Sequence, residues 1–240
     1  VIKNHISKED KYTFALNELS GYVGVKEINK VEAYDVSHIS GENGVASCIV
    51  FTKTGPEKKS YRLFNLPNSL SGNDVGSLEH VLERRIKYFN DPKIKPDLLL
   101  IDGGKTQLKF VNKVLERSNH KDLKAVSIVK GNKRIRATET IISKDGILEL
   151  DKNSKAFLIL QEMRDESHRF AIQAQRKKKR KTIRKSGLDS VKGIGTVLKK
   201  RLLQKFKSIN KIKNASLEDL MTVDGINERI ARSILKKLKW

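Results

Sequence analysis

A short apolar run between two aspartates limits the fold more than any other feature of the chain. Asp97-Leu-Leu-Leu-Ile-Asp102 follows Pro96 and ends at Gly103-Gly104, residues that interrupt regular structure. A continuous apolar run of this length is typical of a β-strand that is buried on both faces of its sheet. Such a sheet needs a covering layer on each side, so the run predicts an α/β or α+β fold with a mixed sheet and helices on both faces.

The residues around this run supply the other elements of such a fold. Short apolar segments predict strands, and apolar residues at helical spacing predict helices. Glycine-containing links join the first three strands, which indicates an antiparallel meander. We expect strands at 31–36, 46–51, 59–65, 97–102, 125–129, 140–142 and 147–150, and helices at 74–89, 105–117 and 154–175.

The predicted α/β domain occupies residues 27–175, and its neighbours differ in composition. Residues 1–26 are expected to form a short amphipathic lead-in. Residues 176–186 contain Arg176-Lys-Lys-Lys-Arg-Lys-Thr-Ile-Arg-Lys185, in which eight of ten residues are cationic. A segment with this charge does not pack in a core and suits DNA phosphates, so we expect a mobile basic linker that contacts DNA. A nuclear-localisation signal has the same composition and is the alternative interpretation.

The tail, residues 187–240, contains an internal repeat. Val191-Lys-Gly-Ile-Gly195 matches Val223-Asp-Gly-Ile-Asn227 at an offset of 32 residues, and flanking apolar positions match at the same offset. Each copy has the pattern of a helix, a tight turn and a second helix. Two such copies can close a small core that neither closes alone, which predicts a small all-α domain.

The Gly-Ile turns of this tail are suited to hold a DNA backbone. Gly193 and Gly195 permit a close backbone approach, and the helix that follows offers free N–H groups to a phosphate oxygen. This is the pattern of a helix-hairpin-helix motif; an ordinary glycine-capped turn is the alternative, and the second copy has Asn227 in place of the last glycine. The predicted DNA-binding residues of the tail and the basic run are Lys192, Gly193, Ile194, Gly195, Lys199, Lys200, Gly225, Arg176, Lys177, Lys178, Lys179 and Arg180.

Two aspartates and a histidine are the candidate catalytic residues. Asp35 lies in the first predicted strand and Asp102 ends the buried strand. If these strands are neighbours, the two carboxylates lie close together, which is costly unless a cation sits between them. One or two Mg²⁺ or Mn²⁺ ions could fill that place and activate water for phosphodiester hydrolysis, with His168 as a ligand or proton shuttle. The alternatives are turn-forming aspartates and a solvent-facing histidine.

Charge and cysteine content narrow the class of partner. Fifty Lys and Arg against 28 Asp and Glu give a net charge of +22, which indicates a polyanionic partner such as nucleic acid. The single cysteine, Cys48, excludes an internal disulfide and a cysteine-based zinc site. No segment has the length and hydrophobicity of a membrane span, so we expect a cytoplasmic protein without a membrane partner.

Four motifs occur in an order that resembles the C-terminal half of the UvrC family, the incision subunits of the bacterial excinuclease. The first is Tyr34-Asp-Val-Ser-His38, followed by Gly41-Glu-Asn-Gly-Val-Ala-Ser47. The others are Leu100-Ile-Asp-Gly-Gly-Lys105, Arg164-Asp-Glu-Ser-His-Arg-Phe-Ala171 and Leu188-Asp-Ser-Val-Lys-Gly-Ile-Gly195. The resemblance implies a ribonuclease H-like nuclease domain followed by a tandem helix-hairpin-helix domain. The implied activity is a metal-dependent DNA endonuclease of nucleotide excision repair, which makes the 5′ incision in the damaged strand.

The resemblance also assigns roles to residues of the site. It implies a triad of Asp35, Asp102 and His168, and a further acidic position in a Gly-Asp-Asp segment that here contains Asn73 and Asp74. Asp74 is the acid that remains, and Asn73 leaves open which of the two positions matches. We further predict supporting roles for Lys105, Arg164 and Arg169, either at phosphates or carboxylates or as plain salt-bridge partners.

The implied partners are damaged double-stranded DNA and UvrB. The segment of the family that contacts UvrB, and the half that makes the 3′ cut, lie upstream of this sequence, so we expect one nuclease site and weak or no binding of UvrB by this piece alone. Two alternative functions are a non-catalytic DNA-binding scaffold with the same fold and a nuclease that acts on RNA–DNA hybrids.

Overall fold

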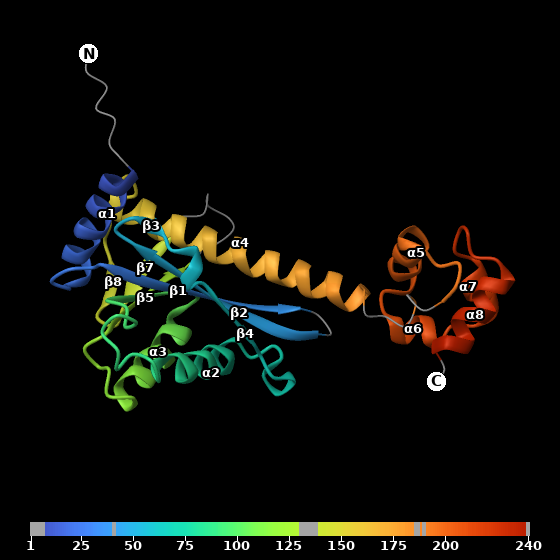
Figure 1. Ribbon diagram of the computed structural model, residues 1–240. Coiled ribbons are helices and arrows are strands. Elements are labelled where there is room, and N and C mark those ends of the chain that lie inside the picture. The colour runs from blue at the N-terminus through green and yellow to red at the C-terminus, as the bar shows by residue number, and fades with distance from the viewer. Residues whose placement is uncertain (1–7, 40–41, 130–138, 185–187, 189–190, 239–240) are drawn as a thin grey trace, which may run out of the picture. The chain divides into compact units, whose positions relative to one another are not determined.

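The computed structural model describes residues 8–39, 42–129, 139–184, 188 and 191–238. The chain divides into two compact units, Val1–Gln175 and Arg176–Trp240 (Figure 1). Among the described helices, none is long and apolar enough to cross a membrane.

The first unit is built on one eight-stranded mixed sheet. Its strands follow the order β3-β2-β1-β5-β6-β7-β8, and β4 also pairs with β2. The central strands β1, β5 and β6 are parallel, and the flanking pairs are antiparallel. The strands are β1 (Lys30–Ile39), β2 (Glu42–Thr52), β3 (Gly55–Pro56), β4 (Arg62–Asn65), β5 (Leu98–Asp102), β6 (Lys124–Val129), β7 (Thr140–Ser143) and β8 (Gly146–Leu148).

This sheet confirms the predicted meander and the buried strand, with one correction. The third strand was expected at 59–65, but Lys58–Ser60 forms the short 3-10 helix η1 and the strand covers only Arg62–Asn65. A second 3-10 helix, η2 (Asn68–Leu70), leads to the helix after it. The fold class is the predicted α/β arrangement.

Helices cover both faces of the sheet (Figure 1). One face packs against α1 (Lys8–Val23) and α4 (Lys155–Arg184), and the other packs against α2 (Asp74–Ile86) and α3 (Lys105–Arg117). Successive side chains of β1 and β5 alternate between these two cores, as the strand period requires. Leu98 and Leu100 face α1 and α4, whereas Leu99 and Ile101 face α2 and α3.

Helix α1, within the N-terminal segment, packs on the sheet of this unit. Residues 1–26 were expected to form a short amphipathic lead-in, and within them Leu16 and Leu19 of α1 are completely buried in the core on the α4 side. The hydroxyl of Tyr12 donates a hydrogen bond to Glu162 of α4 at 2.7 Å. Burial of this ring, together with the nearby Glu162 carboxylate, raises the pKa of Tyr12 to about 12. The segment is therefore part of the covering layer.

The face covered by α2 and α3 contains a buried ion pair. Glu32 is completely buried, and Arg85 of α2 is 5% exposed. The Arg85 Nε donates to both carboxylate oxygens at 3.0 and 3.1 Å, and the Tyr34 hydroxyl donates to Oε2 at 2.5 Å. Burial acts to lower the pKa of Arg85, but the hydrogen bonds and charge of Glu32 outweigh it and raise that pKa. The charge of Glu32 is thus balanced by groups of the chain itself.

The basic run was expected to be a mobile linker, and this expectation is wrong for most of its length. Helix α4 continues through Arg184, so residues 176–184 are helical. Lysine and arginine are good helix formers, and the run contains no glycine or proline to end the helix. Residues 185–187 lie outside the described part of the chain.

Within residues 191–238 the structure describes four helices, and they fit the predicted repeat. They are α5 (Thr196–Phe206), α6 (Ile209–Lys213), α7 (Leu217–Met221) and α8 (Glu228–Leu238). Their core includes the matched pairs Leu188 and Leu220, Val191 and Val223, and Leu202 and Ile234. Two copies of the pattern close one small core, as the 32-residue offset indicated.

Candidate functional site: an acidic cluster at the sheet edge and a helical hairpin pair

Two aspartates of the predicted triad meet at one edge of the sheet. Strands β1 and β5 are parallel neighbours, and Tyr34 pairs with Ile101. The next residue on each strand is therefore Asp35 on β1 and Asp102 on β5. Since the preceding pair faces α2 and α3, the alternation of the strands directs both aspartates to the face that α4 covers.

Helix α4 brings the histidine to these aspartates. Asp35, Asp102 and His168 each offer a ligand atom, and these atoms lie within 4.8 Å of one another. The Nδ1 atom of His168 lies 3.8 Å from Oδ2 of Asp35. Asp35 is only 6% exposed, Asp102 is half-buried and His168 is exposed, so the cluster is open to solvent on the histidine side. The structure thus brings together the three residues predicted to form the triad.

Three serines that were not predicted hold this cluster in place. The Ser37 hydroxyl donates to Oδ2 of Asp35 at 3.0 Å. Ser47 on β2 pairs with Asp35 in the sheet, and its Oγ lies 3.0 Å from the Oγ of Ser167, the residue before His168. Ser47 and Ser167 are both buried, so this contact fixes α4 against the sheet beside the histidine. Ser47 could have been noticed in the sequence as a polar residue within an apolar strand.

The composition of the cluster fits a divalent cation. Carboxylate oxygens suit Mg²⁺ and Mn²⁺, and an imidazole can complete such a set. Two carboxylates held within this distance repel each other, and a cation between them removes the repulsion. Within the described ranges, Asp35 forms no ion pair with an arginine or a lysine, in contrast to Glu32, which pairs with Arg85.

The further acidic position is not part of the cluster. Asp74 is exposed at the first position of α2 and is absent from the group whose ligand atoms converge. Asn73 has a structural role, because its side chain caps α2 by accepting a hydrogen bond from the Gly76 N–H at 2.9 Å. A catalytic role for Asp74 stays a prediction.

The supporting cations have different surroundings. Arg164 is nearly buried in an ion pair with Glu139 and also pairs with Asp165, while Arg169 donates to both oxygens of Glu166 at 2.6 Å. These are the salt-bridge roles left open by the sequence. Lys105 is exposed at the start of α3, three residues after Asp102.

The first Gly-Ile turn of the second unit leads into α5, and the N-terminus of this helix has no side-chain cap. Gly193 has φ of +95°, a value that favours glycine, and Gly195 precedes α5 with no side-chain cap. Lys192 and Lys200 are exposed beside it. Lys199 was also predicted to contact DNA; it is only 5% exposed, and a DNA contact by this residue stays a prediction.

The second turn repeats the backbone of the first but not its open end. Gly225 has φ of +86°, close to that of Gly193. Two residues after Gly225, however, Asn227 Oδ1 accepts a hydrogen bond from the Ile230 N–H at 2.9 Å. The side chain of Asn227 therefore accepts from a backbone N–H at the start of α8, whereas the start of α5 has no side-chain cap.

The basic run at the end of α4 can be assessed only in part. Arg176 and Lys177 are exposed, as DNA contacts need. The side chains predicted to bind DNA beyond them, Lys178, Lys179 and Arg180, lie outside the described part of the structure.

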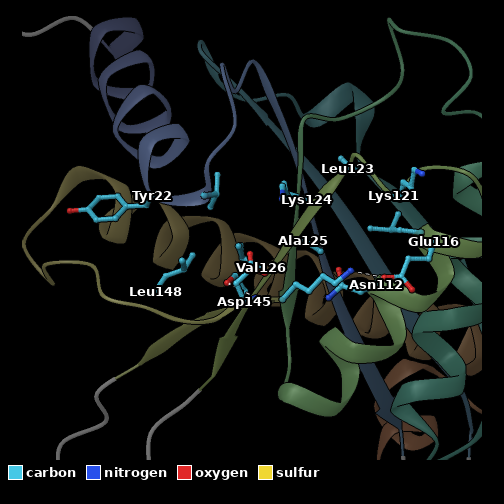
Figure 2. A pocket seen from close by; sticks show the side chains of 14 residues that line it. Tyr22, Asn112, Glu116, Lys121, Leu123, Lys124, Ala125, Val126, Asp145 and Leu148 are labelled. Carbon is cyan, nitrogen blue, oxygen red and sulfur yellow. Dashed lines mark hydrogen bonds and ion pairs between the residues drawn. The ribbon is translucent and has the colours of Figure 1, made fainter.

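An enclosed hollow of the first unit lies away from the acidic cluster. It has a volume of about 160 Å³ and contains none of the predicted catalytic residues (Figure 2). Lys124, which helps to line it, pairs with Leu98 at the start of β5, whereas Asp102 is at the end of that strand. The candidate site is thus an open sheet edge and not this hollow.

Comparisons with known proteins agree with both units. The family described as the UvrC RNAse H endonuclease domain matches residues 21–172, and the family described as a SAM-like helix-hairpin-helix tandem matches residues 185–239. UvrABC system protein C of Legionella pneumophila (strain Paris) is 39% identical over 87% of this chain and 34% of its own length. The protein of the same name from Clostridioides difficile (strain 630) is 36% identical over 95% of this chain and 36% of its own length. The chain thus spans little more than a third of these relatives.

A likeness to solved structures is more distant. Endonuclease V from Streptomyces avermitilis is 12% identical and covers 75% of this chain and 98% of its own, with a TM-score of 0.38. A similarity this low carries no inference about function.

Proposed function

This chain belongs to the family of UvrC RNase H-like endonuclease domains, and we propose that it makes the 5′ incision in the damaged strand during bacterial nucleotide excision repair. The observation that carries this proposal is the convergence of Asp35, Asp102 and His168 within 4.8 Å at one edge of the sheet. We propose Mg²⁺ or Mn²⁺ as the cofactor, held by these three residues.

Each residue of the cluster has its own proposed role in phosphodiester hydrolysis. A divalent ion bound there supplies a Lewis acid for the phosphate and lowers the pKa of a bound water. Asp35 is held in a fixed position by Ser37, and Asp102 faces it from β5. The exposed imidazole of His168 is placed either to complete the ligand set or to accept a proton from the attacking water.

The second unit would hold the DNA backbone without reading its sequence. The open N-terminus of α5 can accept a phosphate oxygen, and Lys192 and Lys200 add positive charge beside it. Arg176 and Lys177 on α4 are exposed and extend the cationic surface. In this proposal the DNA is damaged and double-stranded, the protein that delivers it is UvrB, and the reaction takes place in the bacterial cytoplasm.

Incision of lesion-containing DNA tests the proposal. The sequence is restored to its full-length protein and assayed with UvrA and UvrB, in Mn²⁺ or in EDTA, beside the variant Asp102→Ala. We expect 5′ incision in Mn²⁺ that EDTA and the substitution both abolish. A variant that still makes the 5′ cut would exclude the proposed site. If neither protein makes this cut while DNA binding persists, the chain is a non-catalytic scaffold.

A further inference from the structure

A groove in the first unit, separate from the acidic cluster, is lined by a row of lysines. It lies between α3 and the β7–β8 hairpin and has a volume of about 500 Å³. Leu108 and Ile142 are among its apolar lining residues, and Lys105, Lys109 and Lys113 line it from α3. These lysines are four residues apart, so they project from the same side of the helix.

The charges of the groove are distributed unevenly along its length. Lys105, Lys109 and Lys113 are all exposed, and within the described part of the chain no ion pair joins Lys105 or Lys109 to a carboxylate. The acidic lining residues, Glu116 and Asp145, lie at the far end of α3 and in the hairpin turn.

At that far end the groove meets the enclosed hollow. Asn112 and Glu116 of α3 lie beside Asp145 of the turn there (Figure 2). Lys144 donates to Glu116 at 2.6 Å, so this acid already has a cation as its partner. The half of the groove that begins at Lys105 is therefore the positive half.

This positive half starts at the end of the sheet where β5 ends in Asp102. Lys105 is the first residue of α3 and follows Asp102 by three residues. At 1.5 Å per helical residue, the row from Lys105 to Lys113 is about 12 Å long. The phosphates of one DNA strand are spaced at about 3.4 Å along the duplex axis, so the row matches roughly three nucleotides.

We propose that this groove, lined by Lys105, Lys109 and Lys113, binds the phosphate backbone of the DNA that enters the nuclease site. The inference rests on the proposed function, which gives the position of the scissile phosphate. The groove would be a second surface that contacts DNA, in addition to the hairpin unit. DNA is favoured over an acidic protein segment because the positive charge begins beside the metal-binding cluster and declines away from it. The backbone contacts position the strand and read no sequence.

Charge reversal along the row tests this surface. The variant Lys109→Glu/Lys113→Glu is compared with Lys26→Glu/Lys93→Glu, a control with the same change of net charge. Lys26 and Lys93 are exposed and precede β1 and β5, so they lie at the sheet edge opposite the acidic cluster. Thermal unfolding first establishes that both variants are folded. Binding of undamaged duplex DNA is then measured by fluorescence anisotropy at several salt concentrations.

We expect the row variant to bind DNA at least about tenfold more weakly than the control at 0.1 M salt, with a shallower dependence on salt, because phosphate contacts are lost. Lys109→Arg/Lys113→Arg should bind as the wild type does. Equal affinity of the two charge-reversal variants for DNA overturns the proposal. This is also the result expected if the groove binds an acidic protein segment instead of DNA.

The outcome is distinguishable from failure of the proposed function. Incision by the full-length wild type reports on the acidic cluster alone. If the wild type fails to incise but the row variant still binds DNA more weakly than the control, the proposed surface stands and the proposed reaction is wrong. If the wild type incises but the row variant binds DNA as the control does, the proposed reaction stands and the proposed surface is wrong.

Discussion

Two buried carboxylates on the same strand have opposite surroundings. Glu32 faces α2 and is met by the Arg85 guanidinium and the Tyr34 hydroxyl. Asp35, three residues later, faces α4 and is met by a second carboxylate, that of Asp102, and by an imidazole. A buried charge is tolerated only when it is compensated. The first carboxylate is compensated by an arginine of the chain, and for the second we propose a bound cation, which would separate a structural acid from a functional one.

The two hairpins of the second unit repeat this difference with neutral groups. Asn227 accepts the Ile230 N–H, so the second helix is capped by its own chain. Gly195 has no side chain to do this, and the first helix keeps its N–H groups for a ligand. The uncapped helix of the first hairpin and the cluster at Asp35 are where we propose that partners bind.

The largest effect is expected from Asp35→Asn. Loss of this ligand should reduce metal-dependent incision about a thousandfold, since metal stabilisation is worth several kcal/mol. The variant should remain folded, because the amide keeps a hydrogen-bonding oxygen for Ser37 and removes repulsion from Asp102. Incision and thermal unfolding are measured beside Asp91→Asn, a control at an exposed aspartate before β5. Equal incision by both variants would contradict the difference between structural and functional acids.

On the other side of β1, Arg85→Met should mainly affect stability. Removing the guanidinium leaves Glu32 buried without its cation, which costs about 3–5 kcal/mol in the free energy of unfolding. The double variant Glu32→Leu/Arg85→Met should recover most of this loss, because no charge is then left buried. Urea unfolding of the single and double variants checks both expectations. A single variant as stable as the wild type would show that the pair is not needed to neutralise Glu32.

A smaller effect is expected from Ser167→Ala, which removes the contact between α4 and Ser47. The hydroxyl positions His168 and touches no substrate, so the variant should need about tenfold more Mn²⁺ for half-maximal incision, within the range for groups that orient metal ligands. The maximal rate at saturating Mn²⁺ should change little. Ser167→Thr, which keeps a hydroxyl, should restore part of the Mn²⁺ affinity. An unchanged Mn²⁺ requirement in Ser167→Ala would exclude the positioning role.

One substitution in each hairpin introduces the residue that stands at the matching position of the other hairpin. A Cβ at Gly195 meets no atom within 4 Å, so Gly195→Asn is sterically permitted. The new side chain should cap α5 as Asn227 caps α8 and weaken DNA binding about two- to fivefold, the effect of a helix terminus of about 0.3–1 kcal/mol. Asn227→Gly should strengthen binding by a similar factor. Anisotropy titrations measure both, and a change in the same direction for the two variants would contradict the asymmetry.

The smallest effect concerns Arg169, which was predicted to support the site. Its hydrogen bond is the largest cause of the lowered pKa of Glu166, and the Tyr61 hydroxyl acts in the same direction. A lowered carboxyl pKa stabilises the fold above the unfolded value near 4.5 and loses that contribution as pH falls through the folded pKa. Arg169→Gln should therefore cost less than about 1 kcal/mol at pH 7, and the difference from wild type should vanish as the pH falls below the folded pKa of Glu166. A loss that persists after Glu166 is protonated would assign Arg169 another structural role.

Local patterns predicted the sheet and the position of the two aspartates, whereas the resemblance to the UvrC family joined His168 to them. The apolar run before Asp102 and the alternation around Asp35 fix which side of each strand is buried, and parallel pairing then brings the two aspartates together. The part played by α1 was missed because its packing depends on contacts more than a hundred residues away, such as Tyr12 with Glu162.

Other features could not be predicted because they depend on the direction of single side chains. Lys199 appeared to be one more cation of the hairpin, and only the rotation of α5 places it on the buried side. The Ser47–Ser167 contact joins β2 to α4, and no local pattern indicates that these serines face each other. The basic run was judged by its charge alone, whereas its helix-forming residues continue α4.

A titration with Mn²⁺ tests most directly the claim that Asp35, Asp102 and His168 form a metal site. Binding is followed by isothermal calorimetry for the wild-type chain, for Asp35→Asn and for the control Asp91→Asn. We predict that the wild type and the control bind Mn²⁺ with the same affinity and stoichiometry, and that Asp35→Asn loses this binding. Undiminished binding by Asp35→Asn would contradict the claim, because the ion would then be held elsewhere.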